Sequence, residues 1–134
     1  MKTVITILTA LILSNQAVAA QPTAVQLTAS NYKDYADVRT PVTFLGFARV
    51  KAGKEEEFAT IVDTFVGTMR AQRGNISYDY HQNLADPTEF FFVEEWKNGS
   101  DLEAHMDSKA VGELVSKVGP LFASSLQILV LKKN

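Results

Sequence analysis

Three side chains in the second half of the sequence have the types and spacing that proton chemistry needs. Glu94 and Trp96 alternate along a strand-like segment, and His105 follows Trp96 by nine residues. A neutral imidazole can hydrogen-bond an acidic hydroxyl group, take its proton, or orient the resulting anion. An indole ring offers a flat apolar wall with one N–H donor. His105, Trp96 and Glu94 are therefore the candidate catalytic residues.

Each of these residues also has an ordinary structural explanation. Trp96 could be a core residue at a strand end, and His105 a buried histidine bonded to Glu94 or to a backbone carbonyl. Glu94 could instead pair with Arg70 at the end of the preceding helix. The residues alone leave the structural and the catalytic explanation open.

Other side chains near this group could contact a bound molecule. An aromatic ring on the same strand and a methionine beside the histidine would extend an apolar pocket, and nearby polar groups could bind a polar edge of the ligand. The candidate substrate-binding residues are Tyr78, Arg70, Arg49, Phe92 and Met106.

The elements that must position these residues follow from hydrophobic periodicity. Alternating apolar residues predict strands over residues 42–50, 76–84, 90–96 and 126–132. Apolar residues at three- and four-residue intervals from Phe58 to Met69 predict a helix that ends before Gly74. Ser100 and Glu103 have the spacing of a capping box, which predicts the start of a second helical region.

This order of strand, helix, strand, strand, helix and strand predicts an α+β protein with the ferredoxin-like βαββαβ fold. Such a fold has a four-stranded antiparallel sheet with helices on one face. Strands such as residues 42–50 are apolar on both faces, and an open apolar face would be adhesive in so small a domain. We therefore expect a homodimer in which the sheets of two copies meet.

The chain divides into three predicted segments. Residues 1–20 have the charged start, short apolar core and small-residue exit of a secretory signal peptide. A membrane anchor is the alternative, but the apolar run is about half the roughly 20 residues that span a bilayer. Residues 21–41 form a polar arm or linker, and residues 42–134 form the folded domain. We expect an exported protein, periplasmic or secreted, with no membrane anchor after cleavage.

The composition excludes several classes of function. The net charge is −2 and no basic stripe is present, so nucleic acid is not an expected partner. The chain has no cysteine, and therefore no thiolate nucleophile, iron–sulfur site or cysteine-ligated zinc site. Two histidines are too few for a multi-histidine metal centre in one chain, and the isolated glycines form no phosphate-binding loop. We expect neither a metal nor a cofactor.

Three short motifs resemble the antibiotic biosynthesis monooxygenase family. They follow the patterns A-x-V-x-x-G-x-x-x-x-F, R-x-x-x-G-x-x-x-Y and E-x-W-x(5)-L-x-x-H-x-x-S, and the resemblance extends over residues 42–131. The matching positions are Ala48, Val50, Gly53 and Phe58 in the first, Arg70, Gly74 and Tyr78 in the second, and Glu94, Trp96, Leu102, His105 and Ser108 in the third.

This resemblance implies a dimeric α+β barrel and a cofactor-independent monooxygenase that oxidises a quinol-like or phenolic aromatic substrate with dioxygen. Haem-degrading relatives carry a tryptophan at the position of His105 and an axial histidine near the position of Val115, so haem cleavage is disfavoured, although His105 itself could ligate iron. Family members also often carry an acidic residue shortly before the glycine at position 74, where this chain has Gln72 and Arg73.

Two other functions fit the same residues. The first is a non-catalytic module that binds a small hydrophobic ligand in the same pocket. The second is an isomerase in which His105 shuttles a proton. An oxygenase consumes oxygen, a binding module only changes its stability with ligand, and an isomerase converts its substrate without oxygen.

Overall fold

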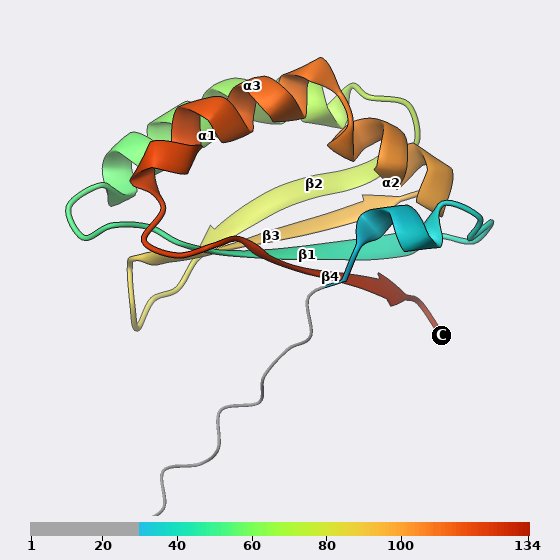
Figure 1. Ribbon diagram of the computed structural model, residues 1–134, viewed down its shortest axis with the longest axis horizontal. Helices are drawn as coiled ribbons and strands as arrows, with labels where there is room; N and C mark the ends of the chain where they lie inside the picture. The colour runs from blue at the N-terminus through green and yellow to red at the C-terminus, as the bar shows by residue number, and fades with distance from the viewer. Residues whose placement is uncertain (1–29) are drawn as a thin grey trace, which may run out of the picture.

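The computed structural model describes residues 30–134, which form an α+β fold (Figure 1). The predicted signal peptide at residues 1–20 and the first part of the predicted arm lie outside the described residues. None of the described helices is long and apolar enough to cross a membrane. The elements are η1 (Tyr32–Tyr35), β1 (Val42–Arg49), α1 (Glu55–Arg70), β2 (Asn75–Gln82), β3 (Glu89–Trp96), α2 (Gly99–Met106), α3 (Lys109–Val118), η2 (Gly119–Leu121) and β4 (Gln127–Lys132).

The four strands form one sheet in the order β2-β3-β1-β4, and every neighbouring pair is antiparallel. Helices α1 and α3 cover one face of this sheet, while α2 and η1 lie at one end of it (Figure 1). This arrangement confirms the predicted ferredoxin-like fold. The second helical region consists of two short helices, α2 and α3.

The covered face of the sheet, which we call the inner face, carries the core. Phe58, Val62 and Met69 form the buried stripe of α1, and acidic residues occupy its first turn, where they complement the helix dipole. Alternate residues of β1 and β3 point toward these helices and are buried. Phe58 packs on Phe90 with ring centroids 4.6 Å apart. The period-two pattern of the strands therefore selects which of their side chains meet the helices.

The opposite face of the sheet, which we call the outer face, is apolar but is not covered by any described element. It carries Leu45, Phe47, Phe91, Val93, Leu129 and Leu131. Phe91 is 39% exposed and Leu131 is 43% exposed. The rings of Phe47 and Phe91 lie 5.1 Å apart and stabilise each other on this surface.

The start of α2 differs from the prediction. Asn98 is its N-cap, and the Asn98 side chain accepts a hydrogen bond from the backbone N–H of Asp101 at 2.8 Å. The predicted capping box at Ser100 is therefore wrong. Ser100 and Glu103 do have the spacing of a capping box, but the helix already begins at Gly99. The backbone of Gly99 lies so close to Tyr35 that a Cβ atom on residue 99 would be 1.7 Å from the Tyr35 carbonyl oxygen.

The described part of the predicted arm packs against α2. The Tyr32 hydroxyl donates to the Asp107 carboxylate at 2.7 Å, and the backbone N–H of Gly99 donates to the Val38 carbonyl at 2.9 Å. The backbone N–H of Ser30 also donates to the Ile128 carbonyl of β4 at 2.7 Å. These contacts fix α2 at the end of the sheet.

Candidate active site

The strand register brings three inner-face side chains level with one another. Glu94 of β3 pairs with Phe44 of β1 on one side and with Tyr78 of β2 on the other. Trp96 lies two residues further along β3 and therefore on the same face. Helix α2 packs against this end of the sheet and brings His105 to it.

Glu94, Trp96 and His105 form one buried group of side chains in contact. The Trp96 indole Nε1–H donates to Glu94 Oε2 at 2.9 Å, and the same oxygen lies 3.3 Å from His105 Nε2. The imidazole ring stacks on the indole with centroids 4.4 Å apart and planes 29° apart. The three residues are 2%, 0% and 4% exposed, respectively. The structure thus brings the three candidate catalytic residues together.

The second nitrogen of the imidazole meets a residue that was not among the candidates. His105 Nδ1 lies 2.5 Å from Gln72 Oε1, and the Gln72 amide donates through Nε2 to Ser108 Oγ at 3.1 Å. The sequence offered only one sign of this contact, namely that Gln72 occupies a stretch where relatives often carry an acidic residue. Its contact with His105 depends on how the loop after α1 docks on α2.

Burial shifts both ionisable groups toward their neutral forms. It raises the pKa of Glu94 from 4.5 to about 8, although the hydrogen bond from Trp96 opposes this shift. It lowers the pKa of His105 from 6.5 to about 4. Near pH 7 the Glu94 carboxyl and the His105 imidazole are therefore both uncharged, with Glu94 Oε2 3.3 Å from His105 Nε2.

A small apolar pocket opens beside this pair. It has a volume of about 60 Å³ between the inner face and α3, and Tyr78, Glu94 and His105 supply its polar groups. Burial raises the pKa of Tyr78, and the nearby Glu94 raises it further, so the phenol stays protonated. The other lining residues are Phe44, Phe92, Met106, Val111, Leu114, Val115, Val118, Phe122 and Leu126. The candidate binding residues Tyr78, Phe92 and Met106 are among them.

The two candidate arginines lie elsewhere. Arg70 donates to the Tyr78 carbonyl at 3.0 Å and to the Asp79 carboxylate at 2.7 Å. The predicted alternative of a Glu94–Arg70 pair is therefore wrong, because Arg70 turns toward the exposed edge strand β2. Arg49 forms ion pairs with Asp86, at 3.0 Å, and with Glu89. Neither arginine lines the pocket.

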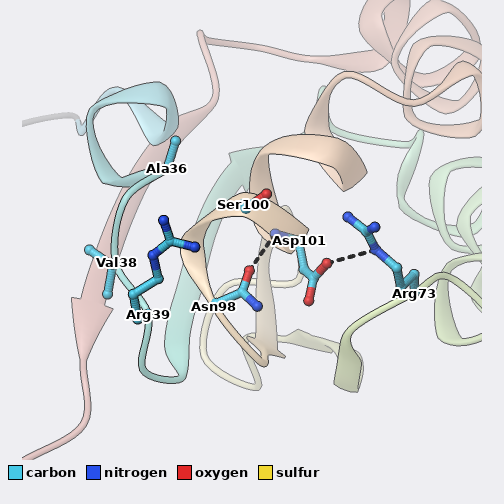
Figure 2. Close-up of a pocket in the computed structure, with 7 residues that line it drawn as sticks. All are labelled: Ala36, Val38, Arg39, Arg73, Asn98, Ser100 and Asp101. Carbon is cyan, nitrogen blue, oxygen red and sulfur yellow. Dashed lines mark hydrogen bonds and ion pairs between the residues drawn. The ribbon is translucent and has the colours of Figure 1, made fainter.

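A second, more polar pocket of about 330 Å³ lies between the arm and the start of α2 (Figure 2). Arg39 comes from the arm, and Arg73 lies on the other side of Asp101, to which it donates at 2.9 Å (Figure 2). The carboxylate of this ion pair is buried, but both arginines are exposed. This pocket contains no buried base, and its ion pair ties the loop after α1 to α2. Within residues 30–134, no cluster of three or more acidic or histidine side chains could hold a metal ion.

Comparison with solved structures places this fold among known ones. An antibiotic biosynthesis monooxygenase candidate from Nitrosomonas europaea superposes with a TM-score of 0.67 at 22% identity, covering 69% of this chain and 89% of that one. A protein from Pseudomonas aeruginosa superposes with a TM-score of 0.65 at 24% identity, covering 71% and 95%. At these identities the likeness extends to the fold.

Sequence comparison identifies the family. An uncharacterised protein of Synechocystis is 32% identical over 92 residues, which are 69% of this chain but only 63% of that relative. YcnE of Bacillus subtilis, named as a candidate monooxygenase, is 25% identical over 66% of this chain and 93% of its own length. The model of the antibiotic biosynthesis monooxygenase family matches residues 41–117, and the chain belongs to this family.

Proposed function

We propose that this protein is a cofactor-independent monooxygenase that oxidises a phenolic or quinol-like aromatic substrate with dioxygen. The observation that carries the proposal is the buried Glu94–His105 pair, stacked on Trp96 and facing an apolar pocket. Family membership and the relative named as a candidate monooxygenase support the reaction class. The pocket brings a proton-holding pair next to the aromatic rings of Phe44, Tyr78 and Phe92. Trp96, the aromatic wall predicted from the sequence, stacks on the imidazole and is not among the lining residues.

The reaction requires no external reductant. A phenol with a free para position and one dioxygen molecule yield a para-quinone and one water, and a quinol with a free ring C–H and one dioxygen molecule yield a hydroxyquinone and one water. In both cases one oxygen atom is added to a ring carbon, the other leaves as water with two hydrogens of the substrate, and the substrate supplies all four electrons. The protein must remove the phenolic proton, because the phenolate passes an electron to dioxygen far more readily than the phenol does.

The Glu94–His105 pair is suited to take this proton. Once the Glu94 carboxyl has lost its proton, the pair carries one negative charge beside the pocket and becomes the base. Because the pKa of Glu94 is raised to about 8, the rate is expected to rise as the pH rises through that value. Tyr78 stays protonated and can donate a hydrogen bond to the substrate oxygen.

The pocket volume favours a small substrate. A cavity that holds one benzene ring has a volume of roughly 150 Å³, against about 60 Å³ here. A ring can therefore enter only if side chains of α3 shift, and Val111 and Val115 are the partly exposed pocket residues on that helix. Single-ring phenols and hydroquinones demand the smallest shift.

Oxygen uptake by the purified, metal-free protein tests the proposal. The substrates are a series from hydroquinones to naphthoquinols and anthrols, with autoxidation subtracted at each pH. His105→Ala is expected to reduce the protein-dependent rate by roughly 10²-fold or more, as loss of a general base does. His81→Ala, which changes the exposed histidine of β2, is the matched control and is expected to retain the rate.

Failure of this test has a definite meaning. If no substrate in the series gives protein-dependent uptake, the oxygenase proposal is wrong. A rise in melting temperature with the same compounds would then favour the binding module, and anaerobic conversion would favour the isomerase.

We further propose that a second copy of the chain covers the outer face. An apolar surface built from six exposed or half-buried side chains of three strands is what a sheet-to-sheet interface would bury. In such a homodimer the active site of each copy would stay on its own helix-covered face. The support for this proposal is exposed Phe91, the half-buried Phe47 ring packed against it, and the neighbouring leucines.

A further inference from the structure

We propose that Gln72 is a positioning residue for His105: its amide oxygen holds Nδ1–H and so directs the bare Nε2 of the ring toward Glu94. His105 Nδ1 lies 2.5 Å from Gln72 Oε1, and His105 Nε2 lies 3.3 Å from Glu94 Oε2. A neutral imidazole has one donor and one acceptor nitrogen, so fixing the first also fixes the second. For its effect on the reaction rate, this inference rests on the proposed function.

The Gln72 amide is itself held in one orientation. Its Nε2 donates to Ser108 Oγ at 3.1 Å, and the same hydroxyl oxygen accepts from the backbone N–H of Val111 as the N-cap of α3. With its NH2 group engaged there, the amide presents its oxygen to His105. A link therefore runs from the first turn of α3 through the loop to the imidazole.

The loop that carries Gln72 is locked onto α2. The next residue, Arg73, pairs with Asp101 at 2.9 Å (Figure 2). Gly74 follows with φ of +79°, and a Cβ atom there would lie 2.1 Å from the Asp101 carboxylate. Three consecutive loop residues thus contact α2: Gln72 contacts His105, and Arg73 and Gly74 contact Asp101, which lies one helical turn before His105. This fit sets the position of Gln72 before any substrate arrives.

The reverse arrangement of hydrogen bonds would produce a different site. If the Gln72 amide were turned, its NH2 group would donate to Nδ1, and Nε2–H would donate to an ionised Glu94. The pair would then already carry a negative charge at neutral pH. The charged and titratable groups that face the imidazole are Glu94 on β3 and Tyr78 on β2, while Asp101 on its own helix is neutralised by Arg73. No cation faces this pair among the described residues, and burial disfavours that charged state.

Nitrogen-15 NMR of the imidazoles in the full chain tests the inference without measuring activity. The chain has two histidines, so exposed His81 serves as the reference ring in the same spectrum. Near pH 7, His105 is expected to show a protonated Nδ1 and an unprotonated Nε2. The opposite tautomer in the wild-type protein would overturn the inference, whatever the oxygen-uptake experiments show.

Two substitutions extend the test. Gln72→Leu removes the acceptor and is expected to let His105 adopt the Nε2–H form; an unchanged tautomer would overturn the inference. Gln72→Glu keeps an acceptor for Nδ1–H, so the tautomer is expected to persist while the added negative charge raises the pKa of His105. Gln82→Leu, on the exposed end of β2, is the matched control. If the oxygenase activity is found, Gln72→Leu should lower it by up to roughly 10²-fold, and Gln72→Glu should shift its pH profile.

Discussion

Two neighbouring glutamates of β3 differ in burial because they point to opposite faces of the sheet. Glu94 points to the inner face, where it is 2% exposed and contacts Trp96 and His105. Glu95 points to the outer face and is only half-buried. Burial raises the pKa of Glu94 to about 8. The strand alternation alone thus assigns one carboxyl to a proton-holding role and leaves the other at the surface.

The two histidines repeat this contrast. His105, on the buried side of α2, contacts Glu94 and Trp96, and burial lowers the pKa of its imidazole to about 4. His81 is exposed on β2. The residue type therefore says little about function in this chain, whereas the covered face concentrates the groups whose ionisation is perturbed.

Truncating the buried tryptophan should produce the largest difference between the faces. Trp96 is fully buried, so Trp96→Ala is expected to lower the free energy of unfolding by about 3–5 kcal/mol. Phe91→Ala, on the outer face, is expected to lower it by less than about 1 kcal/mol in solutions dilute enough to keep the chain monomeric. Urea unfolding measures both. Equal losses would mean that the outer face is packed as tightly as the inner one.

The pH dependence of stability should sharpen the contrast between the glutamates. Above pH 6.5 the His105 imidazole is neutral in both the folded and the unfolded chain, so it adds nothing to the pH dependence of the free energy of unfolding. Between pH 6.5 and about 8 the unfolded chain has released the Glu94 proton and the folded protein retains it. Folding therefore binds a proton, and this group lowers the free energy of unfolding as the pH rises through this window.

Below pH 6.5 the two groups act in opposite directions. The unfolded chain binds a proton at His105 that the buried ring does not take up, so stability due to this ring rises with pH from about 4 to 6.5. In Glu94→Gln only this rise should remain, and the decline from pH 6.5 to 8 should be absent. Glu95→Gln should retain the wild-type curve. A wild-type decline that persists in Glu94→Gln would contradict the raised pKa.

A charge on the outer face should break the proposed dimer with little effect on the fold. Phe91→Asp is expected to weaken self-association by at least tenfold, about 1.4 kcal/mol, because it places a carboxylate among apolar side chains. Leu84→Asp introduces the same charge at a fully exposed turn and is the control. Sedimentation velocity over a range of concentrations measures both. A wild-type chain that stays monomeric throughout would refute the dimer.

The sequence predicted those features that depend on local periodicity. Alternation along residues 90–96 was enough to place Glu94 and Trp96 on one face, and helical spacing placed His105 inward beside Leu102. The order of elements was enough to predict the ferredoxin-like fold. These features depend on which side chains are buried, and the spacing of apolar residues within each segment indicates those side chains.

Features that depend on the docking of separate segments were beyond the reach of the sequence. Asn98 rather than Ser100 caps α2, because Gly99 must meet the backbone of the arm at Tyr35. Gln72 meets His105 because the positive φ of Gly74 and the Arg73–Asp101 ion pair set the loop against α2. Both contacts join segments about 30 to 60 residues apart, and no local pattern encodes them.

The most direct test of the central claim, that the chemistry belongs to the inner face, compares oxygen uptake by Glu94→Gln and Glu95→Gln with the same quinol. The two variants make the same chemical change one residue apart. The account predicts that Glu94→Gln loses roughly 10²-fold or more of the protein-dependent rate, while Glu95→Gln retains it. Equal rates in the two variants, or a loss confined to Glu95→Gln, would contradict it.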